Sequence, residues 1–140
     1  MSRKVVDASV AVKWYLPEVH DVPSRRLLTN GDELLVPDLI FPEVGNILWK
    51  RVRMGQMTEA EGQTILASLA SLPLQVTSSG SLVSSALAIS CETGRTVYDS
   101  LYLALAVREN SVMVTADKKF YNALRGTPLS PFVLWVENLS

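Results

Sequence analysis

Short runs of β-branched and other apolar residues alternate along the chain with segments whose apolar positions recur every three or four residues. The short runs predict buried strands, and the longer periodic segments predict helices. We expect strands at residues 4–6, 34–36, 74–77, 112–115 and 132–136. We expect helices at residues 8–16, 23–29, 39–54, 58–72, 81–92, 97–109 and 118–124. Strands separated by helices need crossover connections, so the pattern predicts a three-layer α/β/α fold with a central, mainly parallel sheet.

Two of the predicted helices carry further signals. Thr58 and Glu61 have the spacing of a capping box, which marks the start of a helix. The helix at residues 97–109 is apolar on nearly every side, so we expect it to be buried. Four apolar residues on helices are expected in the core, with a dimer seam or a groove for a partner helix as the alternative; they are Trp14, Trp49, Leu66 and Leu69.

Four acidic residues stand where a strand should end or a helix should begin: Asp7, Glu43, Asp99 and Asp117. Asp7 directly follows the first predicted strand, and Asp117 follows the strand at residues 112–115 with one residue between. Ligands of parallel sheets bind outside the carboxyl ends of the strands, at the point where strand order reverses. If these strands are neighbours there, the two carboxylates face each other. The alternative is that Asp7 and Asp117 are ordinary helix caps and that Asp99 belongs to a capping box.

Glu43 is harder to explain as a cap, because it lies on the apolar side of its predicted helix. No basic residue stands three or four positions away, and an unpaired buried carboxylate costs several kcal/mol. A metal ion, or a water held by one, would remove that cost. Asn46 could hydrogen-bond the same cluster, and the hydroxyls of Ser9 and Thr115 could orient carboxylates or water.

The composition narrows the class of protein. The 140 residues fit one domain, residues 1–140, with a single core. A net charge of −1 argues against nucleic-acid binding by bulk charge, although it allows a nuclease with an acidic metal centre and a local basic rim. The single cysteine, Cys91, suits a reducing cytoplasm and is expected to be buried in its apolar helix. Neither a signal-peptide pattern nor a membrane-spanning stretch is present in the sequence, so we expect a cytoplasmic protein.

Four blocks of sequence resemble, in order and spacing, the PIN-domain ribonucleases and, among them, the VapC toxins of type II toxin–antitoxin pairs. The blocks are VVDASVAVKWYLPE, VPDLIFPEVGNILWK, TVYDSLYLALAV and VTADKKFYNAL. The resemblance implies a sheet of about five strands in the order 3-2-1-4-5. It implies that Asp7, Glu43, Asp99 and Asp117 form the family's acidic quartet, with Thr115 as the accompanying hydroxyl. It also implies Mg²⁺ or Mn²⁺ as cofactor, RNA as substrate, a homodimer, and a cognate VapB-type antitoxin encoded alongside.

An acid-only site suits a hard cation such as Mg²⁺ or Mn²⁺ rather than zinc. The only histidine, His20, lies in a polar segment and is expected in a surface loop, so the nucleophile would be water activated by the metal. Asp7, Asp99 and Asp117 would hold the metal, and Glu43 would ligate it or position the water. Basic residues near the acidic blocks could contact RNA phosphates, although a solvated helix face is the alternative for each; they are Lys13, Arg95, Lys118 and Lys119.

Three alternative functions are weighed against this one. The first is a PIN nuclease of RNA processing that has no antitoxin. The second is a receiver-like signalling domain whose acidic pocket binds Mg²⁺ and accepts a phosphoryl group. It would need a paired acid at the first strand end and a lysine after the last strand, and this sequence has neither. The third is a non-catalytic binding module, against which the four intact acids count.

Overall fold

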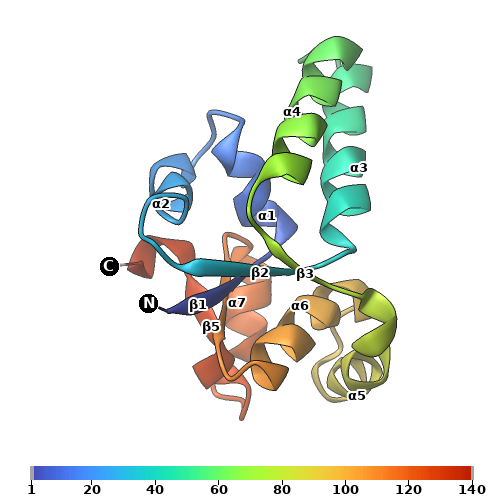
Figure 1. Cartoon of the computed structure of the whole chain (residues 1–140). Coiled ribbons are helices and arrows are strands. Elements are labelled where there is room, and N and C mark those ends of the chain that lie inside the picture. Colours follow the sequence, from blue (N-terminus) through green and yellow to red (C-terminus); the bar gives the residue numbers. More distant parts are fainter. Residues whose placement is uncertain (1, 140) are drawn as a thin grey trace.

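Five parallel strands form one sheet at the centre of the molecule (Figure 1). The structure is a computed structural model that describes residues 2–139. The strands are β1 (Arg3–Val6), β2 (Glu33–Pro37), β3 (Gln75–Thr77), β4 (Val112–Thr115) and β5 (Val133–Trp135). Their order is β3-β2-β1-β4-β5, and every neighbouring pair is parallel. The predicted fold class and strand order are confirmed.

Helices cover both faces of the sheet (Figure 1), with α1 to α4 on one side and α5 to α7 on the other. The first four are α1 (Ala8–Ala11), α2 (Asp21–Arg26), α3 (Ile40–Arg53) and α4 (Glu59–Ser71). The others are α5 (Val83–Thr93), α6 (Val97–Arg108) and α7 (Lys118–Leu124). Helices α3 and α4 pack side by side as a hairpin whose far end stands away from the sheet.

Local chemistry sets several of these boundaries. The predicted helix at residues 8–16 is shorter, because α1 ends at Ala11 and a 3₁₀ turn (Val12–Trp14) follows before Pro17, which has no N–H to continue a helix. The capping box is present. The Thr58 hydroxyl accepts a hydrogen bond from the Glu61 N–H at 3.1 Å, and the Glu61 carboxylate accepts one from the Thr58 N–H at 3.0 Å.

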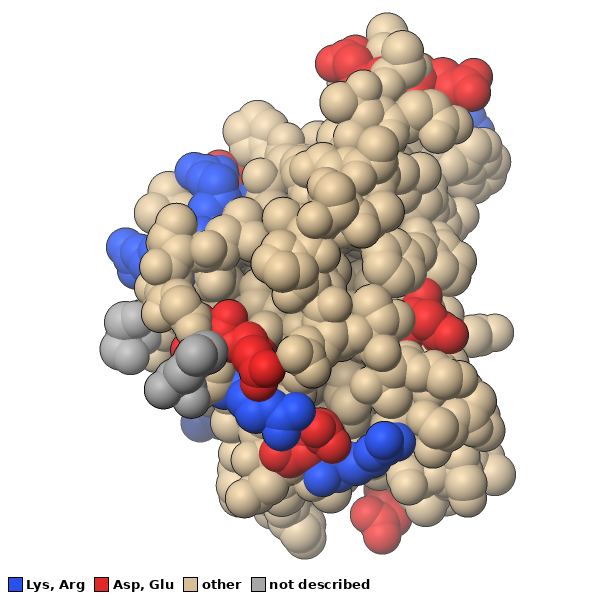
Figure 2. All heavy atoms as spheres, in the orientation of Figure 1, with Lys and Arg blue, Asp and Glu red and all other residues tan. Residues whose placement is uncertain are grey.

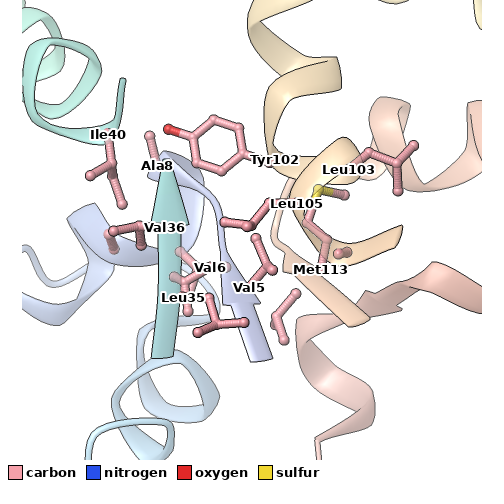
Figure 3. Packing of buried hydrophobic residues seen from close by; sticks show 14 of the residues in the cluster. Val5, Val6, Ala8, Leu35, Val36, Ile40, Tyr102, Leu103, Leu105 and Met113 are labelled. Carbon is pink, nitrogen blue, oxygen red and sulfur yellow. The ribbon is translucent and has the colours of Figure 1, made fainter. Parts of the chain in front are cut away.

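The core lies on both faces of the sheet, against α6 on one side and against α1 and α3 on the other, and Figure 3 shows part of it. Every residue of α6 from Ser100 to Ala106 is buried, which confirms the prediction for this helix. Val5 and Val6 of β1, together with Met113 of β4, are fully buried in the core. Even so, no helix within residues 2–139 is both long enough and apolar enough to cross a membrane.

Two predictions of burial are wrong. Trp14 and Leu69 are buried and Leu66 is partly buried, but Trp49 is 52% exposed. Helix α3 buries a face whose residues are spaced four apart, Ile40, Val44 and Leu48. Trp49 follows Leu48 directly, so the helix turns it about 100° away from the core.

Cys91 is also exposed rather than buried. Helix α5 packs on α6 through Ala86 and Ile89. Val83, Leu87 and Cys91 are four residues apart and share a neighbouring stripe that faces outward. The apolar pattern of α5 is therefore wider than the face that its own fold covers.

Candidate metal centre

The point at which strand order reverses lies between β1 and β4, which pair with Val6 opposite Val114. Asp7 directly follows β1, and its N–H donates to the Val114 carbonyl at 3.4 Å. Asp117 lies two residues beyond the end of β4. The topology therefore brings both aspartates to the carboxyl edge of the sheet, where ligands of parallel sheets bind.

Asp7 is held by several donors although it is only 6% exposed. Its Oδ1 accepts from the Ser9 hydroxyl at 2.6 Å and from the Val10 N–H at 3.1 Å, and its Oδ2 accepts from the Thr115 hydroxyl at 2.6 Å. Burial raises the pKa of Asp7 to about 6, the three donors oppose that rise, and the charge of Asp117 adds to it. Asp7 thus caps α1 with a carboxylate whose charged form is disfavoured by burial.

Thr115 links Asp7 to Asp117. It is fully buried, its Oγ1 donates to Asp7, and the same oxygen accepts from the Asp117 N–H at 3.0 Å. The Asp117 Oδ1 accepts from the Phe120 N–H at 3.2 Å and so caps α7. Asp7 and Asp117 are therefore helix caps, and the capping bonds also hold both carboxylates at the shared edge of the sheet.

Glu43 finds its partner on another helix. The Tyr102 hydroxyl donates to Glu43 Oε1 at 2.5 Å, and in Figure 3 its oxygen points from α6 toward the start of α3. Burial raises the pKa of Glu43, the Tyr102 bond opposes the rise, and the charge of Asp99 adds to it. Glu43 lies in the first turn of α3, where its N–H bonds to the Leu39 carbonyl at 3.1 Å even though Pro42 precedes it.

Asp99 lies in the first turn of α6, where its N–H donates to the capping Thr96 hydroxyl at 3.1 Å. Its carboxylate faces Arg95, with 2.8 Å between Nη2 and Oδ2. The same Nη2 is 3.7 Å from the Asp117 Oδ2. Burial raises the pKa of Asp99, Arg95 opposes the rise, and the charge of Asp117 adds to it.

These influences join the four acids into one electrostatic unit. Asp117 acts on both Asp7 and Asp99, and Asp99 acts on Glu43. The atoms at this site that could coordinate a metal ion are carboxylate and hydroxyl oxygens, which fit Mg²⁺ or Mn²⁺. As they stand, no three acidic, histidine or cysteine side chains within residues 2–139 are arranged to hold a metal ion. Each carboxylate instead accepts a hydrogen bond or forms an ion pair with another group of the protein.

The predicted basic residues are placed differently from one another. Lys13 pairs with Glu18 at 3.2 Å and is largely buried. Lys118 is exposed, and its Nζ lies 4.4 Å from the ring centre of Trp135 and 5.4 Å from that of Tyr121. Of the predicted phosphate contacts, Arg95 is the one whose ion pairs reach the acids.

Asn46 and His20 stand outside the hydrogen-bonded network. Asn46 is exposed and lines an open pocket with Glu43, but no hydrogen bond joins it to the acids in the part of the chain that the structure describes. His20 Nδ1 lies 2.6 Å from the Glu137 carboxylate, and no hydrogen bond joins His20 to the four acids within residues 2–139.

Sequence reasoning missed two contacts of this site. It did not identify Tyr102 as the partner of Glu43, and it placed Arg95 on the substrate side rather than among the acids. A signal for the first was present, because a tyrosine on a buried helix needs a partner for its hydroxyl and Glu43 needed a donor.

Comparison with known proteins shows the family to which the chain belongs. The family model "PIN domain" matches residues 4–125. Ribonuclease VapC3 of Pyrobaculum aerophilum is 35% identical over 117 residues, which cover 82% of this chain and 89% of that protein.

Solved structures share the fold. The crystal structure of PAE2754 from Pyrobaculum aerophilum has a TM-score of 0.73 at 24% identity, covering 97% of this chain and 85% of that one. VapBC2 from Rickettsia felis, bound to a DNA fragment from its promoter, has a TM-score of 0.63 at 14% identity, covering 95% and 98%. The receiver-like alternative is no longer needed, since the match extends over most of the sequence and includes all four acidic blocks. The chain belongs to the PIN-domain family, as a VapC-type member.

Proposed function

We propose that the chain is an Mg²⁺- or Mn²⁺-dependent endoribonuclease and the toxin of a toxin–antitoxin pair. The observation that supports the proposal is the network at the carboxyl edge of the sheet, where Thr115 links Asp7 to Asp117 and Arg95 lies between Asp117 and Asp99. Glu43 belongs to the same site through the charge of Asp99, which acts on it. The identity with Ribonuclease VapC3 supports RNA as the substrate. The oxygen-only donor set supports the choice of metal.

Each acid has a distinct role in the proposed reaction. Asp7, Asp99 and Asp117 would hold the cation, which when bound lowers the pKa of water and neutralises phosphate charge. Glu43, oriented by Tyr102, positions the attacking water and takes its proton; burial has already raised the pKa of this carboxylate. The water oxygen bonds to phosphorus, and the bond from phosphorus to the 3′ oxygen breaks. The leaving oxygen takes a proton from solvent, which gives a 5′-phosphate and a 3′-hydroxyl.

We expect a few basic residues near the site, rather than a broad basic surface, to contact the RNA phosphates. On the face that Figure 2 shows, basic and acidic side chains lie interleaved, and acidic ones gather at the far end of the α3–α4 hairpin. Lys118 and Lys119 are exposed at the start of α7, directly after Asp117. We propose them as phosphate contacts at the rim of the site.

Asp99→Asn is expected to slow metal-dependent RNA cleavage at least about 100-fold, because it removes one charge from the cation site. The matched control is Asp38→Asn. Asp38 follows β2 at the same edge of the sheet, but its carboxylate accepts from the Ser79 N–H at 3.0 Å. The control should cleave within about twofold of wild type.

Cleavage of an end-labelled RNA with Mn²⁺, and with EDTA in its place, measures the activity of both variants. Cutting by Asp99→Asn at the wild-type rate, or undiminished cutting in EDTA, would contradict the proposal.

The toxin role has its own test. Induced expression of the wild-type chain in a bacterial host should stop growth, and Asp99→Asn should not. Co-expression of a small gene found directly upstream should restore growth, because the antitoxin is expected there. If the purified protein cleaves RNA but its expression leaves growth unaffected, the chain is an RNA-processing nuclease without an antitoxin.

A homodimer and a cytoplasmic location belong to the same proposal. The exposed stripe of α5, with Val83 47% and Leu87 57% exposed, offers apolar surface for a second copy. The solution mass from light scattering distinguishes a dimer from a monomer.

A further inference from the structure

Arg95 occupies an unusual place for a cation in a site proposed to bind a metal. It follows Gly94, whose φ of 75° ends α5, and precedes the first turn of α6. Its guanidinium lies between two of the four acids, 2.8 Å from Asp99 Oδ2 and 3.7 Å from Asp117 Oδ2 through one nitrogen, Nη2. The positive charge therefore stands between two carboxylates that a metal ion would have to bring together.

The surroundings of Arg95 hold it there. Its guanidinium carbon is 4.8 Å from the ring centre of Phe120, a residue that is 2% exposed and whose own N–H bonds to Asp117. Its side chain is 24% exposed, and its Nε is buried without a hydrogen-bond partner within residues 2–139. The ion pairs and the Phe120 ring stabilise the buried position of Arg95. The unsatisfied Nε–H destabilises it, because a buried donor without a partner is unfavourable and would be hydrated if Arg95 moved out to solvent.

We propose that Arg95 is a resident counter-cation that neutralises Asp99 and Asp117 in the metal-free protein and must withdraw before a divalent cation binds them. The inference rests on the proposed metal centre. A metal ion needs the carboxylate oxygens that Arg95 faces, and two cations at this spacing repel each other. Arg95 thus competes with the metal and sets its affinity. The opposite role, in which Arg95 only orients Asp99 for the metal, predicts the opposite effect of removing it.

Mn²⁺ binding measured by calorimetry, without RNA, separates these roles. Arg95→Gln should bind Mn²⁺ about tenfold more tightly than wild type, because the competing charge is gone. Arg95→Lys keeps the charge and should stay close to wild type. The matched control is Arg25→Gln, which breaks another arginine–aspartate pair of spacing four, Arg25 with Asp21 at 3.0 Å on α2. It should leave Mn²⁺ affinity unchanged.

A second measurement uses the unaltered chain. In a ¹⁵N spectrum the Arg95 Nε–H should exchange slowly with water without metal, since it is buried, and quickly at saturating Mg²⁺. Equal or weaker Mn²⁺ binding by Arg95→Gln, or an Nε–H signal that stays protected at saturating Mg²⁺, would overturn the inference and leave the proposed nuclease intact. Wild type that binds no Mn²⁺ at all would overturn both the inference and the metal dependence. RNA cleavage, assayed separately, then decides whether nuclease activity survives.

Discussion

Asp7→Asn is expected to slow RNA cleavage at least about 1,000-fold while leaving the metal-free protein as stable as wild type or more stable. The activity falls because asparagine removes a charge from the centre of the cluster. The stability does not fall, because the charged form of Asp7 is itself unfavourable in its buried position. Asparagine resembles the protonated carboxyl in size and can still accept hydrogen bonds from Ser9 and Val10.

The pH dependence of unfolding tests the second half of this prediction. The folded-state pKa of Asp7, about 6, lies above its ordinary value of 3.8. The folded protein therefore binds this proton more tightly than the unfolded chain. The resulting stability is fully present below about pH 3.8 and is lost as the pH rises through 6. The loss by pH 7 amounts to about 3 kcal/mol, and Asp7→Asn should abolish it.

Urea unfolding in EDTA at pH 4 and pH 7 measures the effect. Asp38→Asn is the control of opposite sign, because hydrogen bonds from Ser79 lower the pKa of Asp38. Its removal should leave the unfolding free energy at pH 7 unchanged or slightly reduced. A variant Asp7→Asn that is clearly less stable than wild type at pH 7 would show that the carboxylate is held mainly by favourable contacts.

Thr115→Val should lower the free energy of unfolding by about 2–4 kcal/mol. Valine has nearly the shape of threonine, so the change removes little packing. It deletes the hydroxyl that donates to Asp7 Oδ2 at 2.6 Å and accepts from the Asp117 N–H at 3.0 Å. Both partners are then left without that bond at a fully buried position. RNA cleavage should fall about 100-fold as well, because Asp7 loses the bond that fixes one of its oxygens.

Thr115→Ser is the matched variant, since it keeps the hydroxyl and removes only a methyl group. It should lose about 1 kcal/mol of stability and most of its activity should remain. Denaturant unfolding and Mn²⁺-dependent cleavage of the same preparations give both quantities. Equal stability of the valine and serine variants would mean that the hydroxyl contributes nothing, and the network at the strand ends would need another explanation.

The edge at which the acids meet could be predicted from the sequence because parallel strands impose it. Once Asp7 and Asp117 are known to follow strands, their convergence depends only on β1 and β4 being neighbours. The contacts across the site could not be predicted in the same way. Arg95 reaches Asp99 at a spacing of four, but it precedes α6, so helical periodicity does not describe the pair. The bond between Glu43 and Tyr102 joins residues 59 positions apart on helices that cover opposite faces of the sheet. Only the folded arrangement of α3 and α6 around the sheet brings these two side chains together.

The sequence also could not predict which apolar residues of a helix are exposed. Apolar residues predict a helix and its period, but the fold decides how wide a face is covered. In α3 and α5 the covered face is narrow, and Trp49 and Cys91 lie just outside it. A single sequence does not distinguish such residues from core residues, because their chemistry is the same and only their angle around the helix differs.

The exposure of Cys91 makes the protein a convenient object for spectroscopy. It is the only cysteine in the sequence, so a thiol-reactive probe attaches at one place without any substitution. It also lies on α5, the helix that packs against α6 and leads directly into Arg95. A nitroxide at Cys91 would have its resonance broadened by a paramagnetic Mn²⁺ bound among the acids, and a fluorophore there would report a second copy docking on α5. The residue that was expected in the core thus provides a natural attachment point four positions before Arg95 in the sequence.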